Sequence, residues 1–287
     1  MIFSGEKCSF VAFIIVMYGK LFTPSNAPLN ALVIVIHGIG EHCGCYDELA
    51  EKFAAQSVGV FSFDLRGHGH SPGRRGHTSI ENIKDDLRFV IDIMRQKFLD
   101  VPVVLFGHSL GAHIALSYAI DGNVNVQGII ASSPWLKMVK PPSSMLVGLA
   151  KWTSPVLPWI TVKTGIKAAQ LAQGGVGVRS SKNDPLLHKK ISIKLFSDLW
   201  TNSKTILCNP YRIKIPLLVM HGTADPLTSY HTSESFVQNV GEYATFKPWN
   251  DKRHNLLNDI GSEEVFQYMM KWLSQIFNFQ WNCSEHP

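Results

Sequence analysis

The sequence has few charged residues and no dense basic run, and this shortage excludes one large class of partners. Charged residues make up 17% of the 287 residues, and the net charge of +5 comes from lysines scattered along the chain. A nucleic-acid groove needs clustered basic residues with interleaved aromatics. We therefore expect no nucleic-acid partner, and the charge supports at most a mild attraction to anionic membrane surfaces.

Cysteine is also scarce. The five cysteines form an odd number at irregular spacings: Cys8, Cys43, Cys45, Cys208 and Cys283. Such a set argues against a disulfide framework and for a reducing compartment. We expect free thiols in a cytoplasmic protein, with inert buried thiols at Cys43, Cys45 and Cys208. The alternative for these three is a thiol whose modification blocks a pocket.

No apolar run is long enough for a helical membrane span. The longest candidate, "CSFVAFIIVMYGK" near the start, holds about ten apolar residues, too few to cross a bilayer. We expect a first buried strand over residues 8–16. The alternative is the apolar part of a targeting segment, but only Lys7 precedes it and no small-residue cleavage motif follows.

Metal-ligand and phosphate-binding patterns are missing as well. His108 and His113 are five positions apart, about 140° around a helix, so they do not share a face as a zinc-binding i, i+4 pair does. His68 and His70 have no cysteine or carboxylate set with ligand spacing beside them. "GHSLGA" and "GGVGV" match neither the phosphate-binding motif G-x-x-x-x-G-K-[ST] nor a complete dinucleotide-binding motif G-x-G-x-x-G. We expect no metal and no cofactor.

What the sequence does contain is an alternation of strands and helices. Short β-branched runs predict strands over 31–37, 58–63, 101–106, 126–132 and 215–220. Helical patterns lie between them over 46–56, 80–98 and 110–120. This alternation predicts an α/β fold with a mostly parallel, doubly wound sheet and a site at the carboxyl ends of the strands.

The alternation stops after Pro134 and returns near Cys208. The segment between has apolar clusters broken by prolines and a glycine patch, which predicts a helical insertion that forms a cap, or lid. We therefore divide the chain into a first core part (1–134), a helical cap (135–205) and a second core part (206–287).

"GHSLG" fits the G-x-S-x-G nucleophile elbow, a strained strand-to-helix turn that presents a serine. Glycines are needed two residues either side because a Cβ there would collide with neighbouring backbone. A predicted strand precedes the motif and a helical pattern follows it, which disfavours the alternative of an ordinary glycine-rich turn. Ser109 is the candidate nucleophile.

A serine hydroxyl needs a histidine base that is held by a carboxylate, and in this fold the order is Ser, Asp, His. Asp225 follows the strand 215–220, and His254 follows 29 residues later. The alternatives are a turn-forming Asp before Pro226 and a surface-loop histidine. Asp251 is the carboxylate to test if Asp225 fails.

An oxyanion needs two aimed N–H donors. We expect one from the backbone of Leu110, which follows the nucleophile, and one from Ile39 in the loop after an early strand. His37 is expected to brace that loop rather than react.

These motifs together resemble the monoacylglycerol lipase and lysophospholipase family of α/β-hydrolases. The matching stretches, in order, are "HGIGEHCGCYDELAEKFAAQSVGVFSFDLRGHGHSPGRRG", "GHSLGA", "NDPLLH", "HGTADPLTS" and "HNLLND", within roughly residues 17–275. The resemblance implies an α/β-hydrolase fold, with Ser109, Asp225 and His254 as nucleophile, orienter and base, and an oxyanion hole at Ile39 and Leu110. Residues 8–16 and the cap sequence depart from the family pattern.

The cap is expected to choose the substrate. Its candidate substrate-binding residues are apolar: Leu146, Leu149, Trp152, Leu157 and Trp159. They offer surface for an acyl chain and for peripheral membrane contact, although each could instead pack the cap on the core. We expect hydrolysis of a small lipid ester, a monoacylglycerol or lysophospholipid, through an acyl-Ser109 intermediate. The alternatives are a peptidase of the proline-iminopeptidase kind and a non-enzymatic receptor for an apolar ligand.

Overall fold

The computed structural model describes the chain except residues 1–5, 13–14, 26, 123, 174–183 and 282–287, and for 6–16 it describes the backbone alone. In this part of the chain the main sheet has eight strands in the order β1-β2-β4-β3-β5-β6-β9-β10. The strands are β1 (Glu6–Ala12), β2 (Ile15–Phe22), β3 (Ala31–Ile36), β4 (Val58–Phe63), β5 (Val103–His108), β6 (Gly128–Ser132), β9 (Leu217–Gly222) and β10 (Ala244–Trp249). From β4 to β10 all neighbours are parallel, while β1 and β2 are antiparallel additions at one edge.

The expectation of one strand over residues 8–16 was wrong, because this run contributes to two antiparallel strands that pair Phe10 with Met17. Composition carried no signal for the chain reversal, since apolar residues continue through both strands. The expected burial of this run falls on side chains that the structure does not describe. Met17, the next residue along the chain, is buried. No helix among the described residues has both the length and the apolarity of a membrane span.

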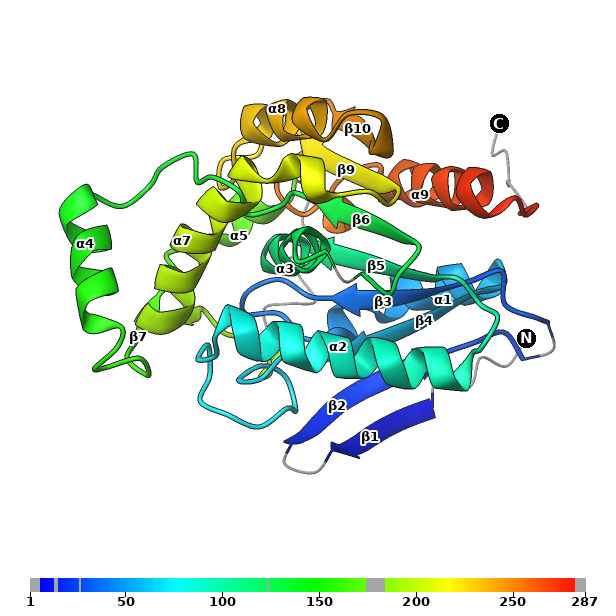
Figure 1. The fold of residues 1–287 in the computed structure, drawn as a ribbon, viewed down its shortest axis with the longest axis horizontal. Helices are drawn as coiled ribbons and strands as arrows, with labels where there is room; N and C mark the ends of the chain where they lie inside the picture. The colour runs from blue at the N-terminus through cyan, green and yellow to red at the C-terminus, as the bar shows by residue number, and fades with distance from the viewer. Residues whose placement is uncertain (1–5, 13–14, 26, 123, 174–183, 282–287) are drawn as a thin grey trace.

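Helices cover both faces of the sheet, as its continuous apolar strands predict (Figure 1). On one face lie α2 (Ile80–Lys97), α3 (Leu110–Ile120) and α8 (Tyr230–Val240). On the other lie α1 (Asp47–Ala55) and α9 (Ser262–Phe277). All six residues of β3 are buried, because alternate side chains enter the two cores. The fold is therefore the predicted α/β-hydrolase type of doubly wound sheet.

The inserted segment projects from one end of the sheet (Figure 1). Its elements are α4 (Ser144–Thr153), β7 (Thr161–Lys163), α5 (Ala168–Leu171), β8 (Lys190–Ser192) and α7 (Ile193–Cys208). The prediction of a purely helical insertion was incomplete, because β7 and β8 pair as a small antiparallel sheet. The predicted cap limit at residue 205 falls inside α7, which continues three residues further.

Short 3₁₀ turns complete the described elements: η1 (Cys43–Tyr46), η2 (Pro210–Arg212), η3 (Gly241–Tyr243) and η4 (Leu256–Asn258). Two of them flank the site. The turn η1 follows the loop after β3, and η4 begins two residues after His254. The loops after β3, β5, β9 and β10 therefore meet at the carboxyl ends of the strands.

Candidate active site

Ser109 occupies a strained turn between β5 and α3. Its backbone has φ 54° and ψ −107°, in the positive-φ region that side chains rarely adopt. A Cβ at Gly107 would lie 2.4 Å from the Gly111 backbone, and a Cβ at Gly111 would lie 1.8 Å from the Ile36 carbonyl oxygen. Only glycines allow this approach, so the turn has the form of the nucleophile elbow.

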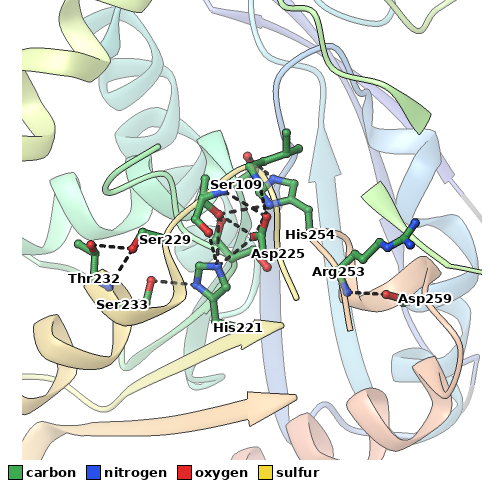
Figure 2. A network of polar contacts seen from close by, with 12 residues as sticks. Ser109, His221, Asp225, Ser229, Thr232, Ser233, Arg253, His254 and Asp259 are labelled. Carbon is green, nitrogen blue, oxygen red and sulfur yellow. Dashed lines mark hydrogen bonds and ion pairs between the residues drawn. The ribbon is translucent and has the colours of Figure 1, made fainter. Parts of the chain in front are cut away.

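The fold brings Ser109, His254 and Asp225 into one hydrogen-bonded chain (Figure 2). His254 Nδ1 lies 2.7 Å from Asp225 Oδ2, and His254 Nε2 lies 2.9 Å from Ser109 Oγ. The ionised carboxylate can only accept, so Nδ1–H donates to it and Nε2 of the neutral ring accepts from the serine hydroxyl. This is the geometry that lets a histidine take the proton of a serine as it attacks a carbonyl.

Asp225 is held by several donors besides His254. Its Oδ1 accepts from the backbone N–H of Leu227 (2.7 Å) and of Thr228 (3.1 Å), and its Oδ2 accepts from Thr228 Oγ1 (2.8 Å) and His221 Nε2 (3.0 Å). Burial opposes ionisation, but the facing imidazoles and these hydrogen bonds outweigh it and hold the Asp225 pKa well below its usual range. The carboxylate is therefore charged at neutral pH.

Neither histidine beside the nucleophile in sequence contacts Ser109 Oγ. His108 is buried with its ring centroid 4.9 Å from that of His254, and burial lowers its pKa to about 4 despite the nearby Glu41 charge. The His113 ring lies against the Trp135 carbonyl oxygen (2.7 Å) and Asn202 Oδ1 (2.8 Å), and burial lowers its pKa to about 4. Both rings are neutral at pH 7 and serve packing and hydrogen bonding.

The two amides expected to form an oxyanion hole come from the start of α3 and from the loop after β3. Leu110 is the first residue of α3, where an amide has no intrahelical acceptor. Ile39 lies in the loop after β3, and neither amide donates to an acceptor among the residues that the structure describes. His37 braces this loop: Nδ1–H donates to the Gly38 carbonyl (2.8 Å), and Nε2 accepts from the Leu65 amide (3.0 Å).

Glu41 was missed by the sequence analysis and lies beside this loop. Its Oε2 accepts from the Gly38 amide (2.9 Å) and from the Tyr46 hydroxyl (2.7 Å), while Oε1 lies 3.4 Å from Asn255 Nδ2, next to His254. Burial opposes its ionisation, but His108 and these donors lower its pKa. Glu41 therefore links the loop after β3 to the loop that carries His254.

The cap also touches the loop after β3. His42 Nε2 lies 2.8 Å from Asp184 Oδ2, and the His188 amide donates to the Gly40 carbonyl oxygen (3.0 Å). The "NDPLLH" motif thus contacts the loop next to Ile39. Before the structure, only the family resemblance singled out this motif.

The five predicted substrate-binding residues all lie in the cap and are partly or largely exposed. Their exposed fractions are 53% for Leu146, 53% for Leu149, 79% for Trp152, 37% for Leu157 and 46% for Trp159. Within α4 only Val147 is buried. Each of the five keeps more than a third of its surface accessible, and their role in substrate binding stays a prediction.

The remaining candidates have other surroundings. Asp251 is exposed, and its backbone amide donates to Thr223 Oγ1 (2.9 Å). The carboxylate that meets His254 is that of Asp225. The His68 ring lies tilted against two others, with its centroid 5.1 Å from that of His37 and 4.6 Å from that of His188. Over the described ranges no cluster of three or more His, Cys, Asp or Glu could hold a metal ion. Cys43, Cys45 and Cys208 are free thiols, and the expectation that all three are buried was wrong for two of them: Cys43 is buried, whereas Cys45 and Cys208 are exposed.

Comparison with known proteins gives the class of fold and then the family. Residues 27–261 match the α/β-hydrolase family described as serine aminopeptidase, S33. A monoacylglycerol lipase structure from Paleococcus ferrophilus is 32% identical, covers 91% of this chain and 99% of its own, and has a TM-score of 0.83. A putative monoglyceride lipase of Schizosaccharomyces pombe is 30% identical over 91% of this chain and 71% of its own length. An uncharacterised abhydrolase domain-containing protein of Dictyostelium discoideum is 30% identical, but the match spans only 27% of its length.

The chain therefore belongs to this α/β-hydrolase family, and the resemblance derived from its motifs is confirmed. The family description names a peptidase, whereas the relatives from Paleococcus ferrophilus and Schizosaccharomyces pombe are named lipases.

Proposed function

We propose that the protein is a serine hydrolase that cleaves small lipid esters, monoacylglycerols or lysophospholipids, and releases a fatty acid. The observation that carries the proposal is the His254 ring, which joins Ser109 Oγ at 2.9 Å to Asp225 Oδ2 at 2.7 Å. The relatives named monoglyceride lipase and the Bacillus subtilis relative named a phospholipase support the substrate class.

The reaction follows from the directions of these hydrogen bonds. Ser109 Oγ attacks the ester carbonyl while His254 Nε2 takes its proton, and Asp225 stabilises the imidazolium that forms. The Ile39 and Leu110 amides stabilise the oxyanion. The proton passes to the departing alcohol, and a water activated by His254 then releases the fatty acid from Ser109.

A peptidase of the proline-iminopeptidase kind is the second candidate, because the family description names an aminopeptidase. Such an enzyme needs an acidic pocket for a free amino terminus. The cap contains only two acidic residues, Asp184 and Asp198. The first is bonded to His42, and the second pairs with Lys194 at 2.6 Å. No carboxylate of the cap is free for a substrate, which favours the ester.

The test is the turnover of the parent and of Ser109→Ala on monoacylglycerols, lysophospholipids, p-nitrophenyl esters and aminoacyl amides. We expect lipid esters to be the best substrates and Ser109→Ala to lose both turnover and fluorophosphonate labelling while it stays folded. Ser117→Ala is the matched control, because the hydroxyl of this buried serine of α3 has no hydrogen-bond partner among the described residues. Retained activity in Ser109→Ala would contradict the mechanism, and cleavage of amides alone would contradict the substrate class.

We further propose that the exposed apolar face of the cap binds anionic lipid surfaces. The cap has eleven basic and two acidic residues. Its outermost helix is α4 (Figure 1). This helix exposes Met145, Leu146, Leu149 and Trp152, and it also carries Lys151. Apolar side chains flanked by lysines are the pattern of an interfacial segment.

Vesicle co-sedimentation tests this contact. The parent should bind phosphatidylserine-containing vesicles more than pure phosphatidylcholine, and the double variant Leu149→Ser/Trp152→Ser should lose most of this binding. Leu99→Ser is the matched control, since Leu99 is 79% exposed and follows α2 at its far end from the cap. Equal binding by the double variant and the parent would contradict the contact.

A further inference from the structure

Asp225 has a second imidazole beside it that the reaction does not use. His221, at the end of β9, is fully buried, and its Nε2 lies 3.0 Å from Asp225 Oδ2 and 3.2 Å from the Thr228 carbonyl oxygen (Figure 2). Both neighbours only accept, so Nε2 carries a hydrogen that they share. His221 therefore donates to the same carboxylate oxygen as His254.

The other nitrogen of this ring fixes its orientation. His221 Nδ1 lies 2.9 Å from Ser233 Oγ, a buried hydroxyl in the first turns of α8. In the neutral ring Nδ1 accepts from this hydroxyl. The Tyr230 ring also meets the His221 ring edge-on, with centroids 6.2 Å apart. The imidazole is thus held between β9 and α8, the two elements that precede and follow the loop that carries Asp225.

His221 differs in origin from the other groups that hold this carboxylate. The Leu227 and Thr228 amides and Thr228 Oγ1 belong to the loop that carries Asp225, so they move with it. Apart from His254, His221 is the side chain that reaches the carboxylate from outside this loop, among the contacts that the structure describes. It ties Asp225 to the end of a buried strand.

We propose that His221 is a positioning residue for hydrolysis, whose Nε2–H holds the Asp225 carboxylate with Oδ2 directed at His254. The inference rests on the proposed roles of Ser109, Asp225 and His254. A displacement of about 1 Å in such a chain lowers the rate by up to about 100-fold. His221 does not contact Ser109, so its loss should reduce kcat rather than raise KM.

The test compares His221→Leu, which removes the donor, with His221→Gln, whose side-chain N–H can reach the same oxygen. We expect kcat per active site to fall about 10- to 100-fold in His221→Leu and to stay within about threefold of the parent in His221→Gln, with KM nearly unchanged in both. Active sites are counted by fluorophosphonate titration. Val219→Ala, on the same strand and buried, is a control that lowers Tm without touching the triad.

A purely structural role predicts something else: a lower Tm in His221→Leu with kcat per active site within twofold of the parent. That result would overturn the proposal, and so would a His221→Gln variant as slow as His221→Leu. The rate of fluorophosphonate labelling is measured alongside turnover because it reports the reactivity of Ser109 with no substrate. If the parent is labelled but cleaves no lipid ester, the substrate class fails while His221 is still judged by the labelling rates.

Nitrogen-15 spectra of the histidine rings give a readout that needs no activity. We expect the parent to show His221 with a hydrogen on Nε2, and the His254 Nδ1–H signal to shift in His221→Leu but to remain near its original place in His221→Gln. A His221 ring protonated only on Nδ1 would contradict the donor role.

Discussion

At the scale of single residues, the site depends on two glycines that let backbone segments approach closely. Gly111 lies where a Cβ would be 1.8 Å from the Ile36 carbonyl oxygen, inside the van der Waals contact of any carbon and oxygen. The obstacle is the backbone of β3, which is buried on both faces and cannot move aside. The position of Ser109 is therefore set by the absence of a side chain two residues away.

Gly111→Ala should destabilise the fold and abolish turnover, because the added methyl pushes α3 away from β3 and displaces Ser109. Thermal unfolding and fluorophosphonate labelling check this. Gly128→Ala is the control, since its Cβ would come no closer than 3.3 Å to the edge of the Trp272 ring. Normal labelling of Gly111→Ala would show that the contact relaxes without moving the serine.

At the scale of elements, the cap and the loop after β3 hold each other. Gly40 has φ +80°, and a Cβ there would lie 2.0 Å from the His188 carbonyl oxygen. The His188 amide donates to the Gly40 carbonyl in the same contact. Because Ile39 is the adjacent residue, the cap segment that leads into β8 fixes the path of the loop expected to supply an oxyanion donor.

Gly40→Ala should therefore lower kcat at least about tenfold, since a strained φ and a backbone collision shift the Ile39 amide. Steady-state kinetics on a p-nitrophenyl ester measure it. Gly148→Ala in α4 is the matched control: nothing lies within 4 Å of its Cβ, so it should leave kcat unchanged and stabilise the helix by about 1 kcal/mol. Equal kcat for both variants would contradict a role of the cap in shaping the loop.

At the scale of the whole molecule, several buried histidines make stability depend on pH. Burial lowers the pKa to about 4 at His108, His113 and His188, from 6.5 for a free imidazole. It also lowers the pKa of His37 and His68. As pH falls through 6.5 the unfolded chain takes up protons that the folded chain does not, so stability is lost between about pH 6.5 and 4.

Near pH 5 the three histidines with a pKa of about 4 account for about two to three protons taken up on unfolding, and each proton is worth about 1.4 kcal/mol per pH unit. Urea unfolding at about pH 7 and pH 5 should therefore show a clear loss of stability. His113→Gln should reduce the difference, while His231→Gln should not, because the His231 side chain is 89% exposed. Equal stability at the two pH values would contradict the shifted pKa values.

Much of the core was predictable because its signals are local. β3 and β4 coincide with predicted apolar runs to within one residue, and α2 and α3 with the predicted periodic patterns to the same tolerance. The antiparallel pair formed by β7 and β8 was not predictable, because the strands pair residues about 30 positions apart and composition does not indicate which segments will pair. The split of the N-terminal apolar run into β1 and β2 was missed for a different reason: the paired residues are close in sequence, such as Ala12 and Ile15, but apolar residues continue through both strands and mark no turn.

By itself the sequence determined the alternation of strands and helices, the strained serine turn and the order in which Ser109, Asp225 and His254 occur. Each of these features is recognised from a short stretch of neighbouring residues or from the order of such stretches along the chain. Only the tertiary structure decided which groups meet. Ser109 and His254 are 145 positions apart, and they lie 2.9 Å from each other because the parallel order of the strands gathers their loops at one edge of the sheet. The same order places Glu41 beside Asn255, 214 positions away, a contact that no local pattern could specify.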